Sequence, residues 1–184
     1  MLLLRPVVLF TSLASAAALA PRLITGTETV LSDLANLEKA VQSQITALNN
    51  FKGGLLGTPL QLTAISATFD ATVLAMTKAA ASVVLLPGPF SAEDSKKVTD
   101  QLTATLAISD PKVCALIKTK RAQFDAVLMR PIVYGNLNIL QGDHLLLSGS
   151  LTAHMDPAYT ARMQEIADIT TRALDDAIAY YKFF

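Results

Sequence analysis

Residues 28–51 read ETVLSDLANLEKAVQSQITALNNF and carry a clear helical pattern. Its apolar residues recur every three or four positions, which places them on one face of an α-helix. Thr27 stands where it could cap the helix, and Lys52 is followed by two glycines that end it. Because one face is apolar, the helix needs partners to cover it. The residues of that face are Val30, Leu34, Leu37, Val41, Ile45 and Leu48.

A second helical pattern begins at Pro59, a residue that is well tolerated in a first helical turn. It is poor in charge, because Asp70 and Lys78 are its only ionisable residues before Pro87. A helix this apolar is typical of the centre of a bundle or of the wall of an apolar cavity.

Further helix starts are marked by capping residues and prolines. Ser91, with Asp94 three positions later, resembles a capping box and predicts the start of a third helix. Asp110-Pro111 and Asp156-Pro157 each combine a cap with a first-turn proline, and they predict the starts of the fourth and last helices. Arg130-Pro131 predicts a kink or a new start between them, after a fourth helix that extends to Leu128.

These patterns predict an all-α fold, an antiparallel bundle of about five helices. No stretch alternates apolar and polar residues as a half-buried strand does. The chain has no Trp and many Ala and Thr residues, so we expect loose packing around a central apolar cavity that a ligand can fill.

The N-terminus has the features of a secretory signal peptide, for which we assign residues 1–20. Arg5 gives a positive start, residues 6–19 are apolar or small, and Ala18-Leu19-Ala20 suits signal peptidase. The apolar stretch is too short for a transmembrane helix, and we expect no transmembrane segment. Residues 21–184 are then one mature helical-bundle domain, located outside the cell or in a cell wall.

Composition excludes several classes of function. The 15 basic and 15 acidic residues cancel, so the chain lacks the basic footprint that nucleic acids require. Two histidines, no nucleophile elbow and no phosphate-binding glycine loop argue against an enzyme, a metal site and a cofactor. A single cysteine, Cys114, cannot form an internal disulfide, and its apolar neighbours favour a buried thiol over an intermolecular bridge.

Candidate ligand-binding residues come from the apolar stripes and from polar groups within them. For any one apolar residue, an ordinary place in the core is the alternative; for Ser66, it is a hydrogen bond to its own helix. His144 stands where Leu or Ile is expected, so it is either half-exposed or a polar group that meets a ligand headgroup. The candidates are Ser66, Phe69, Val73, Met76, Leu102, Leu106, Phe124, Leu128, Leu137, Leu140 and His144.

Both ends of the mature chain resemble one known family. Residues 25–34 read TGTETVLSDL, and residues 173–181 read ALDDAIAYY, on either side of a middle rich in Ala, Thr and Leu. The sequence resembles the fungal hydrophobic surface binding protein A family, which includes the cell-wall galactomannoproteins. The resemblance implies an all-helical domain in secreted or wall-held proteins. Some members adsorb to hydrophobic surfaces, and some enclose fatty acids such as arachidonic acid, which would deprive a host of signalling lipids.

Three functions therefore compete. The first is a carrier of long-chain fatty acids of the arachidonic or palmitic type, held in the bundle. The second is a protein that adsorbs to hydrophobic surfaces, and the third is an antigenic wall component without a small ligand. A plant invertase or pectin methylesterase inhibitor is a poor alternative, because those bundles rely on paired cysteines. A homodimer is left open.

Overall fold

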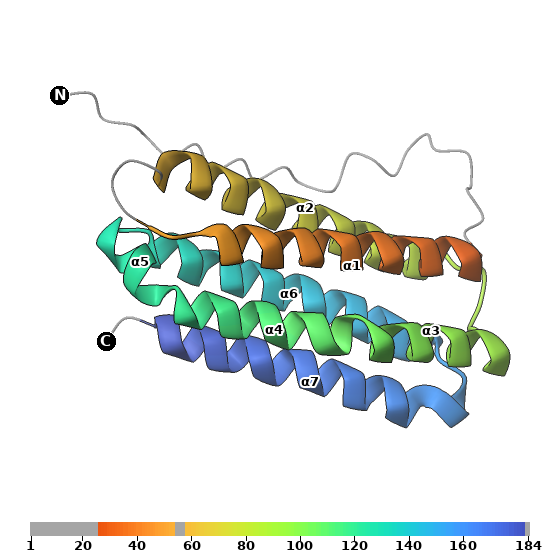
Figure 1. Ribbon diagram of the computed structural model, residues 1–184. Coiled ribbons are helices and arrows are strands. Elements are labelled where there is room, and N and C mark those ends of the chain that lie inside the picture. Colours follow the sequence, from red (N-terminus) through yellow and green to blue (C-terminus); the bar gives the residue numbers. More distant parts are fainter. Residues whose placement is uncertain (1–25, 54–57, 183–184) are drawn as a thin grey trace, which may run out of the picture.

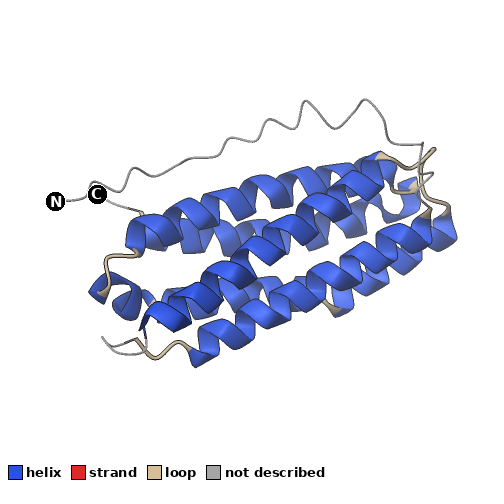
Figure 2. Cartoon of the chain, turned by 90° about the horizontal axis from the view of Figure 1, so that it is seen from above, coloured by secondary structure: helices blue, strands red, loops and turns tan. Residues whose placement is uncertain are grey.

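The computed structural model describes residues 26–53 and 58–182, which form seven helices joined by short links. Apart from the short α5, they lie along one common direction in an elongated bundle (Figures 1 and 2). The all-α prediction is confirmed, and no strand occurs in the described residues. The helices are α1 (Thr27–Asn50), α2 (Thr58–Val84), α3 (Ala92–Ala104), α4 (Leu106–Thr119), α5 (Arg121–Ala126), α6 (Arg130–His154) and α7 (Pro157–Tyr181).

The long helices form five columns, in agreement with the prediction of about five helices. Thr105 alone separates α3 from α4, and the two helices follow one another along the same line (Figure 1). They form one column beside α1, α2, α6 and α7, while the short α5 covers one end. The predicted signal peptide, residues 1–20, lies outside the described residues, so the assignment of residues 21–184 as the mature domain stays a prediction.

Helix α1 buries the whole apolar stripe that the sequence predicts for it. Its cap differs from the prediction, because Gly26 is the N-cap and Thr27 is already helical. The carbonyl oxygen of Gly26 accepts hydrogen bonds from the amides of Thr29 and Val30, at 3.0 and 3.2 Å, and so begins the helical pattern one residue earlier. The predicted cap by Thr27 is therefore wrong by one position.

Helix α2 packs against α1 and α6. The buried carboxylate of Asp33 on α1 forms an ion pair with the Lys78 amine on α2, at 2.9 Å. Residues 59–84 are long and apolar enough to cross a membrane by length and composition, and 39% of their most apolar window is buried inside the bundle. A core helix meets the same test, and the contacts with α1 and α6 place α2 in the bundle.

The column of α3 and α4 begins at the predicted cap, but its interruption is at a different residue from the predicted one. The Ser91 side chain accepts a hydrogen bond from the Asp94 amide at 3.1 Å and caps α3. Helix α4 starts at Leu106, so Asp110-Pro111 lies inside it and does not open it. The break falls at Thr105 instead, whose ψ of −91° is not helical. Pro111 removes one backbone donor without ending the helix.

The predicted fourth helix is also shorter than expected. It ends at Thr119, α5 follows after Lys120, and residues 127–128 form a turn. Leu128 has a φ of 58°, a left-handed conformation that is unusual for a leucine. The Phe51 and Phe124 rings stack with their centroids 4.8 Å apart, and this contact holds α5 over the end of the bundle.

Helices α6 and α7 begin at the prolines that the sequence indicates. Pro131 lies in the first turn of α6, and the Asp156 carboxylate accepts a hydrogen bond from the Ala158 amide at the start of α7. At the opposite end of α7, the buried Tyr181 hydroxyl donates to the Ile117 carbonyl oxygen of α4 at 2.8 Å. These contacts fix α7 against the α3–α4 column and leave an interior lined by five columns.

Candidate ligand-binding cavity

Three small pockets lie in a row inside the bundle. The end pocket lies beside α5 and is lined by residues including Leu48, Phe69 and Phe124. Gln44 and Leu140 line both the end pocket and its neighbour, which we call the middle pocket. The far pocket shares lining residues with the middle pocket in the same way, and it continues along α6 to Leu151. The residues that join the middle and far pockets are Met76, Asp110 and Thr170.

The pockets are narrow. Their free volumes are about 30, 20 and 20 Å³ for the end, middle and far pockets. One water needs roughly 10–15 Å³ of such space, so each pocket has room for about one or two waters. The predicted central cavity is thus a row of narrow gaps, and a long hydrocarbon chain fits only after the helices move apart.

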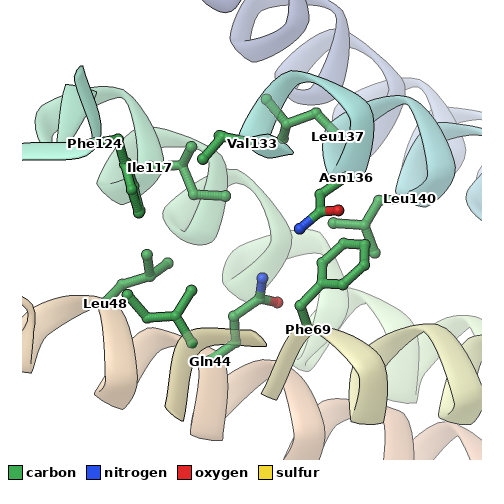
Figure 3. Close-up of a pocket in the computed structure, with 10 residues that line it drawn as sticks. Gln44, Leu48, Phe69, Ile117, Phe124, Val133, Asn136, Leu137 and Leu140 are labelled. Atoms are coloured by element: carbon green, nitrogen blue, oxygen red, sulfur yellow. The ribbon is translucent and has the colours of Figure 1, made fainter. Parts of the chain in front are cut away.

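The end pocket is mainly apolar. Phe69 on α2 and Leu137 and Leu140 on α6 point into it (Figure 3). Two amides, those of Gln44 on α1 and Asn136 on α6, also project into this space (Figure 3). The stripes of α1, α2 and α6 therefore converge here with few polar groups, an arrangement that suits a hydrocarbon chain.

Polar side chains gather along the middle pocket. The Thr170 hydroxyl on α7 donates to the Asp110 carboxyl Oδ2 on α4, at 3.3 Å. The Thr72 hydroxyl on α2 lies 3.3 Å from Gln44 Oε1 on α1 and donates to it. Hydroxyl, amide and carboxyl groups from four helices thus face one short section of the interior.

Asp110 is the unusual group of this section. Burial raises the pKa of its carboxyl to about 7, and the Glu38 carboxylate adds to this rise while the Thr170 hydrogen bond opposes it. Glu38 itself accepts a hydrogen bond from the Ser109 hydroxyl at 2.7 Å. At neutral pH, a large fraction of Asp110 carboxyls therefore carries a proton and can donate a hydrogen bond.

His144 is buried in the far pocket, which excludes the half-exposed alternative for its side chain. Its Nε2 lies 3.2 Å from both the Ala167 carbonyl oxygen and the Thr171 hydroxyl of α7. Burial lowers the pKa of this imidazole, and the hydrogen bond to Ala167 acts in the opposite direction. The ring is thus held neutral and already has partners on α7.

Cys114 is buried, as predicted, and its thiol is free. It lines the middle pocket, and burial raises its pKa to about 12. The thiol therefore stays protonated at neutral pH and acts as a small apolar group.

The structure brings most of the predicted site residues together. Phe69, Phe124, Leu137 and Leu140 line the end pocket, and Met76, Leu102, Leu106 and His144 line the far pocket. Their role toward a ligand stays a prediction.

Three predicted residues do not reach the pockets. Ser66 is exposed on α2, and Val73 is partly buried against the core without lining a pocket. Leu128 is 85% exposed, because α5 ends before it and the turn directs it outward.

Sequence reasoning missed several polar residues that line the pockets, among them Gln44, Asp110 and Asn136. Asp110 was assigned to a helix cap, because Pro111 follows it. A signal was present, since Leu106, Asp110, Val113 and Ile117 are spaced by four, three and four residues. A stripe continued through the proline would have placed Asp110 on the inner face.

The lining of the three pockets suits an apolar chain. In the described ranges, no three His, Cys, Asp or Glu side chains converge as metal ligands. The lining is aliphatic and aromatic with a few placed polar groups, which is the usual composition of a lipid site.

Comparison with known proteins agrees with this geometry. A family model described as hydrophobic surface binding protein A matches residues 27–153, from α1 to the end of α6. No curated protein matches the sequence.

Solved structures with the same fold contain bound lipids. The crystal structure of AfMP4p in complex with palmitic acid is 25% identical, with a TM-score of 0.79, over 85% of this chain and 100% of that one. Ligand binding domain 1 of the Penicillium marneffei MP1 protein, complexed with arachidonic acids, is 15% identical, with a TM-score of 0.77, over 86% and 100%. Domain 2 of the same protein, complexed with multiple arachidonic acids, is 11% identical, with a TM-score of 0.77, over 86% and 97%.

Proposed function

The chain belongs to the hydrophobic surface binding protein A family, and we propose that it binds long-chain fatty acids of the palmitic or arachidonic type inside its helical bundle. The observation that carries this proposal is the row of three mainly apolar pockets, which share lining residues along the bundle axis. The likeness to AfMP4p, whose structure holds palmitic acid, supports the same ligand class. We propose binding without catalysis.

The energetics permit such binding. Burial of about fifteen methylenes at ~0.8 kcal/mol each contributes roughly 12 kcal/mol. Association costs at least ~4 kcal/mol, which leaves about 8 kcal/mol and a dissociation constant of micromolar order. Separation of the helices also costs free energy. The dissociation constant should therefore be no smaller than this micromolar value.

We propose that separation of α2 from α6 opens the pockets. The two helices are neighbours, and their facing residues, such as Phe69 and Leu140, line the end pocket. Helix α2 carries few ionisable side chains, and its one ion pair among the described residues joins it to α1 rather than to α6. Movement of α2 relative to α6 would therefore break apolar contacts and no ion pair.

Saturable binding of palmitic acid, measured by equilibrium dialysis, tests this function. Leu140 lines both the end and middle pockets, so Leu140→Trp fills the row and should weaken binding at least about tenfold. Ile139→Trp is the matched control. The Ile139 side chain is next to Leu140 on α6 but is exposed, so this variant should leave the affinity unchanged. Equal affinities for the two variants would refute an internal site.

We also propose that the protein is secreted and remains extracellular or in the cell wall, where it could sequester host lipids. The signal-like residues 1–20 support this location. N-terminal sequencing of the protein recovered from the medium should begin at Pro21. Retention of residues 1–20 in the recovered protein would refute the proposed cleavage.

A second candidate function, adsorption to hydrophobic surfaces, is favoured by exposed apolar residues on α2 and α6. These helices are neighbours, and each exposes several large apolar side chains to solvent. Adsorption of the folded protein to a hydrophobic solid should fall when Leu145 and Leu146 are replaced by Lys, while palmitic acid binding persists. The exposed residues on these helices are Leu60, Leu74, Val84, Ile132, Ile139, Leu145 and Leu146.

A further inference from the structure

We propose that Asp110 holds the headgroup of a bound fatty acid through one proton that the two carboxyl groups share. This inference rests on the fatty-acid function proposed above. It adds the residue that meets the headgroup and the protonation state in which binding occurs.

The position of Asp110 suits a headgroup contact. Among the residues that line the three pockets in the described chain, Asp110 supplies the one carboxyl group, and it faces both the middle and far pockets. Apolar side chains extend from this point toward α5, past Met76 and Phe69. From Met76 to Ile65, α2 rises by about 16 Å, a length over which a hydrocarbon tail can lie.

A cation beside the pockets would neutralise a fatty-acid carboxylate. The lining residues of the described chain include no Lys or Arg, and Lys78 on α2 pairs with Asp33. An ionised headgroup without a partner would be costly to bury. A hydrogen-bond donor in the pocket lowers this cost, and protonated Asp110 can supply one where the middle and far pockets meet.

The groups around Asp110, on α4 and on the other helices, do not supply positive charge either. Glu38 on α1 is acidic, the Cys114 thiol on α4 is kept protonated, and His144 on α6 is kept neutral by burial. Helices α2, α3 and α7 contribute uncharged lining residues such as Met76, Leu102 and Thr170. Within the described residues, Thr170 gives the Asp110 carboxyl its one side-chain hydrogen bond.

Two carboxyl groups held close together cannot both ionise, so one proton is shared between them. When Asp110 is already protonated, it donates that proton in a hydrogen bond to the ligand carboxylate, and no proton is exchanged with solvent. When Asp110 is ionised, binding takes up one proton from solvent. Affinity for ionised fatty acid is then constant below the Asp110 pKa of about 7 and falls by about tenfold per pH unit above it.

Equilibrium dialysis of trace radiolabelled palmitic acid between about pH 6 and pH 9 tests this inference. We expect the dissociation constant of the wild-type protein to rise by about tenfold per unit above pH 7, with one proton bound per ligand. Asp110→Asn can still donate a hydrogen bond through its amide. Its affinity for palmitic acid should therefore equal that of the wild-type protein at acidic pH and should not change with pH. Asp70→Asn, at an exposed position of α2, is the matched control and should keep the wild-type slope.

A Thr170→Val variant gives an independent measurement. The Thr170 hydrogen bond lowers the pKa of Asp110, so its loss should move the onset of weakening to higher pH. If the affinity of Asp110→Asn falls with pH as steeply as that of the wild-type protein, or if the wild-type affinity does not change with pH, the proposal of a shared proton is wrong. The fatty-acid function would still stand. Failure of the folded wild-type protein to bind palmitic acid at any pH would overturn both proposals.

Discussion

His144 Nε2 lies 3.2 Å from the carbonyl oxygen of Ala167, so an imidazole on α6 is fixed against the backbone of α7 inside the bundle. Burial lowers the pKa of this imidazole, although the hydrogen bond to Ala167 partly opposes the shift. Protonation therefore favours the unfolded chain, in which the imidazole has its ordinary pKa. The stability contributed by neutral His144 is fully present above about pH 6.5 and is lost as the pH falls below that value.

We predict that acidification from about pH 7 to about pH 5 lowers the urea midpoint of the wild-type protein. His144→Gln keeps a donor for the Ala167 carbonyl oxygen and removes the titration, so its midpoint should change less. His154→Gln, near the end of α6, is the control and should follow the wild-type protein. An equally steep loss of stability in His144→Gln would show that this imidazole is not the responsible group.

A second prediction concerns stability at alkaline pH. Asp110 has a folded pKa of about 7 against an ordinary value of 3.8, so ionisation favours the unfolded chain as the pH rises through this range. At about pH 8 the ionised carboxyl should therefore lower the free energy of unfolding by an amount on the order of a few kcal/mol at most. Asp110→Asn should therefore raise the melting temperature at about pH 8 and change it little at about pH 4. A melting temperature lowered at both pH values would contradict this sign.

A third prediction separates two adjacent tyrosines. Tyr181 is fully buried, and its hydroxyl donates to the Ile117 carbonyl oxygen at 2.8 Å. Tyr181→Phe removes this buried hydrogen bond and leaves the Ile117 oxygen with the Lys120 amide as donor, so the free energy of unfolding should fall by about 1 kcal/mol. Tyr180→Phe should be nearly neutral, because Tyr180 is exposed and it contacts Arg121 through its ring and its backbone oxygen rather than its hydroxyl. Equal effects in urea denaturation would contradict the buried hydrogen bond.

A fourth prediction concerns the free thiol. Burial and the raised pKa of about 12 should make Cys114 unreactive toward iodoacetamide at about pH 8 in the folded protein. Labelling should become rapid in denaturant, and bound palmitic acid should slow it further in the native state, because Cys114 lines the middle pocket. Rapid labelling of the native protein would show that this pocket is open to solvent.

The periodic stripes made most of the helices predictable, because burial of an apolar face constrains every third or fourth residue. The Ser91 cap and the prolines at 131 and 157 marked true helix starts, since each satisfies or removes an amide that lacks a helical partner. The local signal failed at Pro111, where packing of the α3–α4 column keeps the proline inside a helix. Tertiary contacts outweighed a preference worth about 3 kcal/mol there.

The candidate site was predictable in its apolar part only. Residues such as Phe69 and Leu140 follow from the stripes, because the inner face of a bundle helix is apolar. Asp110 and Thr170 contact each other across 60 positions of sequence, and no local pattern reports such a pairing. Leu128 shows the reverse, since a turn after α5 directs an apolar side chain outward.

Native mass spectrometry of the protein as recovered from its producing cells, followed by extraction of bound material, shows whether a fatty acid occupies the bundle. We predict a discrete added mass that corresponds to about one or two fatty acids, retained in Ile139→Trp and lost in Leu140→Trp. An unliganded mass that stays unchanged after palmitic or arachidonic acid is added would contradict a fatty-acid site inside the bundle.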